Sequence, residues 1–289
     1  MRGRAGVLGV LVAAVAAIAA PAARADHHDL NVPWPQALPP LVHATGDGHP
    51  VPNCETPSVA CVDDLARRLE AQWRAWDATC DHRAVMALSY LRITQELARE
   101  MRAGEFDHPA WMAYLVADFS NRYFQAIAAY DAGRPVAPAW KIALDAMTEG
   151  DTTGAQDILL FSNAHVAHDY PYALVSQGLV SKHDHDQINE VNSRILDDTQ
   201  DEVAARYDPS MAWLDLKPSP VDEIAALEVV KGWRELTWRN AELLTLTRSS
   251  PAVGAEIDAD TTAWATLIAT PLPGWRAQRD AFCAAHHGA

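Results

Sequence analysis

The residues most able to do chemistry in this chain are a histidine and an aspartate four positions apart, His165 and Asp169. In a helix this spacing places both side chains on one face, which also carries Ile158, Phe161 and Tyr172. Such a face points at least partly inward, and burying an ionisable group without a partner costs several kcal/mol. Three arrangements would satisfy the pair: an internal hydrogen bond, a bound metal ion, or a general base that the carboxylate orients.

A proline follows this pair directly, at position 171. Proline has no N–H to donate, and its ring clashes with the carbonyl group four residues earlier, here that of Ala167. We therefore expect the helix to kink beside His165 and Asp169 and to leave one backbone acceptor free.

A second group of polar residues opens the next predicted helix. His185 and Asn189 are again four apart, and Asn192 continues the same stripe. Asp184 and Asp186 suit helix capping or interaction with the helix dipole. Because consecutive helices joined by a short turn are usually antiparallel neighbours, we expect this stripe to meet the first pair.

Nitrogen and oxygen donors from two helices would suit a divalent metal, zinc first, with iron or manganese as alternatives. The predicted ligands are His165, Asp169, His185 and Asn189. A water on that ion, with its pKa lowered, would attack an ester or phosphoester in a small-molecule or lipid-like substrate. The predicted base or orienting residues are Asp81 and Asp186, and the predicted substrate contacts are Tyr172, Tyr90 and Arg83.

A non-enzymatic alternative starts from the ten tryptophans of the chain. Kinked helices rich in tryptophan can enclose an apolar cavity, with the histidine and aspartate groups closing a buried hydrogen-bond network. The protein would then be a secreted or envelope protein that binds an apolar small molecule.

The elements that must position these residues are helices throughout. Beyond residue 62 the apolar residues recur at a helical period, and alternating stretches bounded by turn signals are missing. The predicted helices are 63–78, 81–104, 106–131, 138–147, 153–178, 184–207, 220–247, 255–269 and 274–286. We predict an all-α, single-domain multi-helix bundle with an extended proline-rich N-terminal arm.

The first 61 residues divide into two predicted segments. Residues 1–25 begin with Arg2 and Arg4, followed by an apolar run of about 16 residues and the triplet Ala23-Arg24-Ala25, as in a secretory signal peptide. A membrane anchor is the alternative, but the run is shorter than the roughly 20 residues of a spanning helix. Residues 26–61 hold seven prolines and form the predicted arm, followed by the helical domain 62–289. We expect a secreted or cell-envelope protein, cleaved near Ala25, with no membrane span in the mature chain.

Four cysteines, at positions 54, 61, 80 and 283, favour two disulfides in an oxidising compartment. The short spacing of the first two predicts Cys54–Cys61, which leaves Cys80–Cys283. One bridge with two free thiols is the alternative.

The charge balance bears on the class of partner. Acidic residues outnumber Lys and Arg by 38 to 23, a formal net charge of −15. Tight nonspecific binding to nucleic acid is therefore not expected, because it requires a basic surface.

The motif from Asn163 to Leu174 resembles the Asn-Ala-His-x-x-x-Asp-x-Pro-x-Ala-Leu core of a bacterial family known as domain of unknown function 5995. His168 and the N-terminal arm lie outside the shared pattern, and the likeness covers about residues 63–245. It implies an all-helical fold and implies no reaction. The other shared blocks are Asp81-His-Arg83, Tyr90-Leu-Arg92-x-Thr94, Phe106-Asp107 before Trp111, Phe119 before Tyr123-Phe124, Pro138-x-Trp140 and Asp184-His185-Asp186-x-x-Asn189.

A weaker likeness concerns spacing alone. The secreted helical zinc phosphodiesterases, which include bacterial phospholipase C and single-strand nucleases, also use His-x-x-x-Asp on one helix and His-x-x-x-Glu or His-x-x-x-Asp on a later one. This chain departs from that pattern with Asn189 in place of the last carboxylate. Its expected mature start, Asp26, also lacks the N-terminal tryptophan of that class.

Overall fold

A computed structural model describes residues 40–42, 45–208 and 221–287 of the chain. The predicted signal peptide and the first part of the predicted arm lie outside these ranges. The described residues form an all-α bundle with one isolated bridge, between Val51 and Cys54, and no strand. None of the helices in these ranges combines the length and the apolar character needed to cross a membrane.

Most helices lie within a few residues of their predicted positions, and local signals account for their ends. Pro109 and Pro138 occupy first turns, where a missing N–H is tolerated, and Gly104 ends its helix at a φ of 78°. The helices before the histidine motif are α3 (Val59–Asp77), α4 (Arg83–Ala103), α5 (Pro109–Asp131) and α6 (Pro138–Glu149). Those after it are α9 (Lys182–Arg206), α11 (Val221–Leu246), α12 (Pro251–Ile268) and α13 (Trp275–His287).

The predicted helix 153–178 is continuous but changes type along its length. It consists of α7 (Gly154–Ser162), the π-helix η1 (Asn163–Asp169) and α8 (Tyr170–Gln177). Pro171 cannot donate to a carbonyl five residues back, and the Val166 oxygen at that position accepts from the Thr237 hydroxyl at 3.1 Å. The acceptor that Pro171 leaves free is thus the Val166 oxygen and not, as expected, that of Ala167, because the π-helix shifts the bonding by one residue, and α11 satisfies it. The widening to a π-helix was not predicted.

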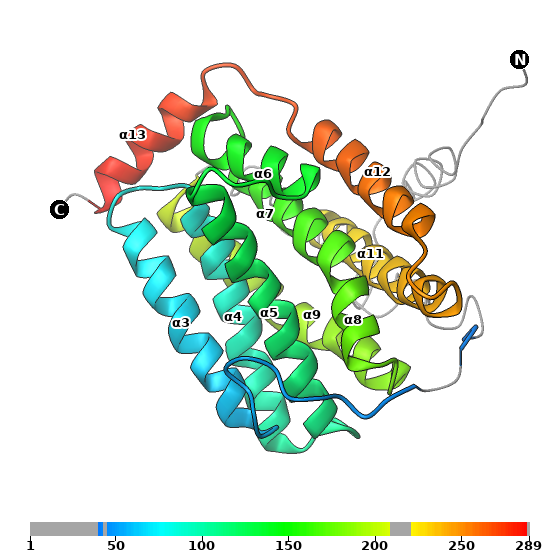
Figure 1. The fold of residues 1–289 in the computed structure, drawn as a ribbon. Helices are drawn as coiled ribbons and strands as arrows, with labels where there is room; N and C mark the ends of the chain where they lie inside the picture. The colour runs from blue at the N-terminus through cyan, green and yellow to red at the C-terminus, as the bar shows by residue number, and fades with distance from the viewer. Residues whose placement is uncertain (1–39, 43–44, 209–220, 288–289) are drawn as a thin grey trace, which may run out of the picture.

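The helix that carries the motif lies in the middle of the bundle. In Figure 1, α3, α4 and α5 lie on one side of it, and α11 and α12 lie on the other. The π-helix packs against α5, α6, α11 and α12, while α9 packs mainly against α4 and α11. The side chains of the π-helix therefore face the principal hydrophobic core, whose residues extend from Val62 to Ala265 along the chain.

The described part of the arm is extended and lies against the end of α8. The backbone N–H of Thr45 donates to Leu179 O, and that of Gly48 donates to Gln177 O, both at 3.1 Å. Gly178, at a φ of 85°, leaves no space for a side chain, because a Cβ there would lie 2.0 Å from the Thr45 oxygen. This contact is consistent with the predicted arm laid over the bundle.

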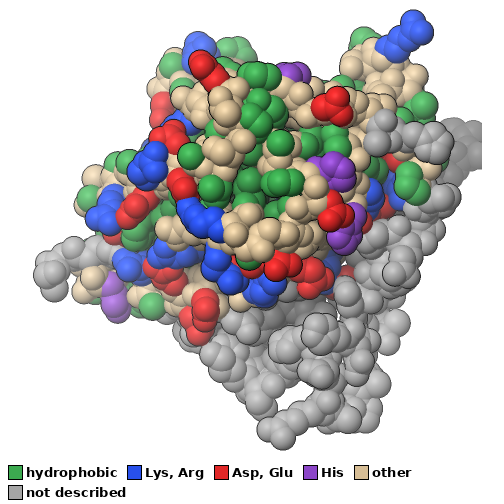
Figure 2. Space-filling view, turned by 90° about the horizontal axis from the view of Figure 1, so that it is seen from below, with side chains coloured by type: hydrophobic (Ala, Val, Ile, Leu, Met, Phe, Trp, Pro, Cys, Tyr) green, Lys and Arg blue, Asp and Glu red, His purple; other side chains and the backbone are tan. Residues whose placement is uncertain are grey.

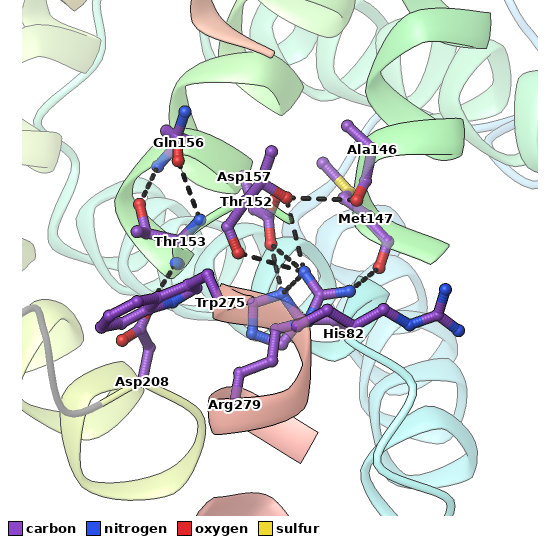
Figure 3. A network of polar contacts seen from close by, with 12 residues as sticks. His82, Ala146, Met147, Thr152, Thr153, Gln156, Asp157, Asp208, Trp275 and Arg279 are labelled. Atoms are coloured by element: carbon purple, nitrogen blue, oxygen red, sulfur yellow. Dashed lines mark hydrogen bonds and ion pairs between the residues drawn. The ribbon is translucent and has the colours of Figure 1, made fainter. Parts of the chain in front are cut away.

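Both predicted disulfides are present, Cys54–Cys61 and Cys80–Cys283. The second joins the turn between α3 and α4 to α13. Next to it, the buried Arg279 of α13 donates to the Met147 oxygen at 2.8 Å and to the Thr152 oxygen at 3.2 Å (Figure 3). The C-terminal helix is therefore held by a covalent bond and by a buried guanidinium.

Candidate functional site

The carboxylate of Asp169 accepts three hydrogen bonds inside the bundle. Its Oδ2 accepts from Trp140 Nε1 at 2.9 Å and lies 3.2 Å from His165 Nδ1. Its Oδ1 lies 2.7 Å from His168 Nδ1. The predicted His165–Asp169 pair is thus formed directly, and a tryptophan from α6 completes it.

The hydrogen bond fixes which nitrogen of His165 carries the proton. An ionised carboxylate only accepts, so Nδ1 holds the hydrogen and Nε2 of the neutral ring keeps its lone pair. Burial lowers the pKa of His165 despite the nearby carboxylate. Burial alone would raise the pKa of Asp169, but the hydrogen bonds from His165 and His168 bring it below its usual value. A neutral imidazole oriented by an ionised aspartate is the arrangement of a general base.

His168 connects this pair to α12. Its Nε2 lies 3.0 Å from an oxygen of Asp258, while its Nδ1 bonds to Asp169. Burial by itself would lower the pKa of His168, but the two carboxylates raise it. Although it lies outside the shared motif, His168 therefore helps to hold Asp169 in place.

His165 lines a cavity of about 60 Å³ between α4, α5, the motif helix, α9 and α11. The walls are mainly apolar, and the Phe119 ring stacks on the His165 ring at a centroid distance of 3.6 Å. Tyr90, a predicted substrate contact, also lines the cavity, and its hydroxyl bonds to Ser120 at 2.6 Å. At about 30 Å³ for each water, this volume holds about two waters or an organic group of a few heavy atoms.

Four of the polar side chains that line this cavity hold buried atoms without a hydrogen-bond partner in the described structure. They are Nε2 of His165, the Tyr170 hydroxyl, Oδ1 of Asn192, and Nε and Nη1 of Arg234. Asn192 belongs to the predicted polar stripe of α9, whereas Tyr170 and Arg234 were not predicted. Convergent polar atoms in an apolar cavity are typical of small-molecule sites.

The structure does not assemble the predicted metal site. His185 Nδ1 bonds to its neighbour Asp186 at 3.0 Å, and its ring packs against Tyr170 and Trp238. Among the described residues, His165, Asp169 and His185 do not form a group with ligand atoms within 4.8 Å of one another. Neither His185 nor Asn189 lines the cavity.

In the described residues, one group of acidic and histidine side chains has ligand atoms within 4.8 Å of one another: Asp107, His183 and Asp184. It lies where the residues before α5 meet the first turn of α9. Figure 2, which views the molecule from below, shows charged and histidine side chains around apolar ones on the face that it draws. The buried Asp184 accepts from the backbone N–H groups of Asp107 and His108 at 2.9 and 2.8 Å. Asp184 was predicted to cap its own helix, but it accepts hydrogen bonds at the start of α5 instead. Ser181 caps α9.

The other predicted catalytic and substrate residues lie away from the cavity. Asp81 and Arg83 pair with each other, and Arg83 also reaches Asp131 at 2.7 Å, which ties the start of α4 to the end of α5. Asp186 accepts from Lys182 at 2.5 Å. Tyr172 lies beside His168, outside the cavity. Their positions favour structural roles.

The chain was compared with models of known protein families. Residues 62–271 match the model of the family of unknown function DUF5995. The chain belongs to this family. No curated protein and no solved structure matches it. The DUF5995 match includes every residue that lines the cavity and ends before α13.

Arg234, inside the DUF5995 match, was not predicted as a site residue, although its position in the sequence carries a signal for it. An arginine on an amphipathic helix ordinarily reaches solvent. Here, however, it shares the apolar stripe of Val230, Trp238 and Ala241, at spacings of four and seven, and the last two are fully buried. A charged residue in the middle of a buried stripe was the available signal.

Proposed function

We propose that this member of DUF5995 binds a small organic molecule in the cavity lined by His165 and Arg234. The observation that carries the proposal is the coincidence of apolar walls with buried polar atoms that lack partners in the described structure. A buried polar atom without a hydrogen bond costs about 1–3 kcal/mol. A bound molecule that satisfies these atoms would recover that cost.

The unpartnered atoms define a complementary ligand. Burial raises the pKa of Tyr170, so its hydroxyl stays protonated and can donate, as the Arg234 guanidinium does. Nε2 of His165 and Oδ1 of Asn192 accept. A molecule with an apolar body, one acceptor group and one hydroxyl or amide N–H would match both kinds of atom.

We also propose that the protein works outside the cytoplasm, in the secreted or envelope fraction. Two disulfides and the leader-like residues 1–25 support this location. We propose no divalent metal for this cavity, because neither His185 nor Asn189, two of the four predicted ligands, is among its lining residues.

Filling the cavity is expected to abolish binding without unfolding the protein. Val230 lines the cavity on α11 and is half-buried, so Val230→Phe adds a ring there at modest cost. Leu243→Phe is the matched control, because Leu243 lies on the same helix with 41% of its surface exposed. A library of small organic molecules is screened by ligand-observed NMR with the oxidised protein. We expect ligands that bind the parent and Leu243→Phe but do not bind Val230→Phe. Equal binding to all three proteins would show that the cavity is not the binding site.

A second candidate function, hydrolysis of a small ester, is favoured by the oriented His165. Nε2 would take a proton from a water molecule as that water attacks the ester carbonyl. The Tyr170 hydroxyl and the Arg234 guanidinium would donate to the carbonyl oxygen as negative charge develops on it. The proton then passes to the leaving alkoxide, giving an alcohol and a carboxylic acid.

His165→Asn is expected to reduce such ester hydrolysis about a hundredfold, the lower range for loss of a general base. Release of p-nitrophenol from short-chain p-nitrophenyl esters gives the rate. The control is His286→Asn, which changes an exposed histidine of α13. Hydrolysis that survives His165→Asn at the parental rate would assign the activity to another group.

A further inference from the structure

Arg234 is a buried cation with no ion pair in the described structure. Its side chain is 95% buried, and Nε and Nη1 have no hydrogen-bond partner. The guanidinium lies 6.0 Å from the centroid of the Tyr170 ring, a weak contact for a charge of this size. Burial lowers the pKa of Arg234, although an arginine stays charged at neutral pH.

Two acidic residues of the described chain, one on α9 and one next to Arg234 on α11, are engaged elsewhere. Asp186, the carboxylate that acts on Arg234 at longer range, bonds to Lys182 and His185. Glu235 pairs with Lys182 and with Arg239. A buried charge left without a counter-ion is strongly destabilising, so a protein that keeps one gains something other than stability from it.

We propose that Arg234 is the counter-ion of a carboxylate on the molecule that occupies the cavity. The inference rests on the proposed function, because it names the ligand class of the same cavity. The carboxylate would take a hydrogen bond from the Tyr170 hydroxyl and pair with the guanidinium, whose planar donors match its two oxygens.

The charge balance of the cavity favours a carboxylate over a phosphate ester. Among the described residues that line it, Arg234 is the one Lys or Arg, and His165 is neutral, so these walls compensate a single negative charge. A phosphate monoester carries close to two charges at neutral pH and has three acceptor oxygens. Apolar side chains that line the cavity, such as Ile93, Leu97 and Val230, suit a short hydrocarbon body.

Matched ligands test this assignment. Acetate, propanoate and butanoate are titrated by calorimetry against the amides of the same chain lengths and against butyl phosphate. The parent protein should bind the best carboxylate at least tenfold more tightly than its amide and than butyl phosphate. Arg234→Gln should bind the amide as the parent does and lose the preference for the acid. Arg99→Gln, which changes an exposed arginine of α4, should keep that preference.

The outcomes separate the two proposals. If the parent binds the acid and the amide equally, the carboxylate assignment falls and the cavity remains a binding site. A preference for butyl phosphate likewise overturns the carboxylate in favour of a phosphate ester. If neither acid nor amide binds the parent, and Val230→Phe binds the same library ligands as the parent, both the binding site and the carboxylate assignment are wrong.

A stability measurement tests whether Arg234 serves only to stabilise the fold. In the ligand-free protein, Arg234→Met keeps the length of the stem and removes the unpaired charge, so we expect a higher Tm than in the parent. A lower Tm for Arg234→Met would mean that the guanidinium stabilises the empty fold. That result would overturn its assignment as a ligand counter-ion.

Discussion

Replacing Asp169 by alanine is expected to lower the free energy of unfolding by about 3–5 kcal/mol, the range for breaking a buried charged pair. The substitution would leave Trp140 Nε1 and the Nδ1 atoms of His165 and His168 without their common acceptor. Three helices, α6, η1 and α12, meet through this carboxylate and its partners. Urea unfolding of the oxidised protein, followed by tryptophan fluorescence, measures the effect.

Two further variants make this expectation specific. Asp169→Asn keeps the shape of the side chain and one acceptor oxygen, so it should cost less than Asp169→Ala. Asp258→Ala removes the other carboxylate that contacts His168, but 50% of the Asp258 side chain is exposed. We expect a loss of under about 1 kcal/mol there, as for a surface ion pair. Equal losses for Asp169→Ala and Asp258→Ala would contradict the central place of Asp169.

Removing the Cys80–Cys283 bridge is expected to cost about 5 kcal/mol at 25 °C in the chain-entropy model. The bridge closes a loop of 203 residues, whereas Cys54–Cys61 closes one of seven, for which the same model gives about 2.5 kcal/mol. Replacing both cysteines of each bridge by serine gives two matched variants. Their midpoints of urea unfolding should differ, with the long-loop variant the less stable.

The neighbourhood of the long bridge adds a second test. Arg279 holds α13 through noncovalent bonds, to the Met147 oxygen and beside the contact between His82 and Asp157 (Figure 3). Limited proteolysis should therefore cut near residue 271 faster in the Cys80→Ser/Cys283→Ser variant than in the parent. If both serine variants unfold at the same urea concentration and resist protease equally, the bridge is not what retains α13.

The sequence predicts the fold well because each helix has local signals that agree with its apolar period. Thr153, the first residue of the predicted motif helix, forms a capping box with Gln156. The even cysteine count and the spacing of Cys54 and Cys61 were sufficient for both bridges. The π-helix was missed because a search at the α-helical period has no means of registering an added residue inside a continuous helix.

The site was harder to predict, since its residues meet through tertiary packing. The His165–Asp169 contact is local, and spacing alone predicts it. The convergence of His185 with that pair depended on how α9 is rotated and which helices it packs against, and neighbouring helices in sequence do not determine this. Arg234 lies 69 residues after His165 along the chain, so no local spacing connects the two.

The π-helix has a consequence for chain length. Each of its turns holds one residue more than an α-helical turn, so the segment Asn163–Asp169 contains residues that a continuous α-helix would not need. A deletion of one residue there could let the segment tighten while α7 and α8 keep their places in the bundle. The same deletion would change which side chains face Asp169. A family member with one residue fewer between the equivalents of His165 and Asp169 would thus keep the architecture and lose the four-residue spacing of the pair, which makes the length of this segment a marker for sorting DUF5995 chains.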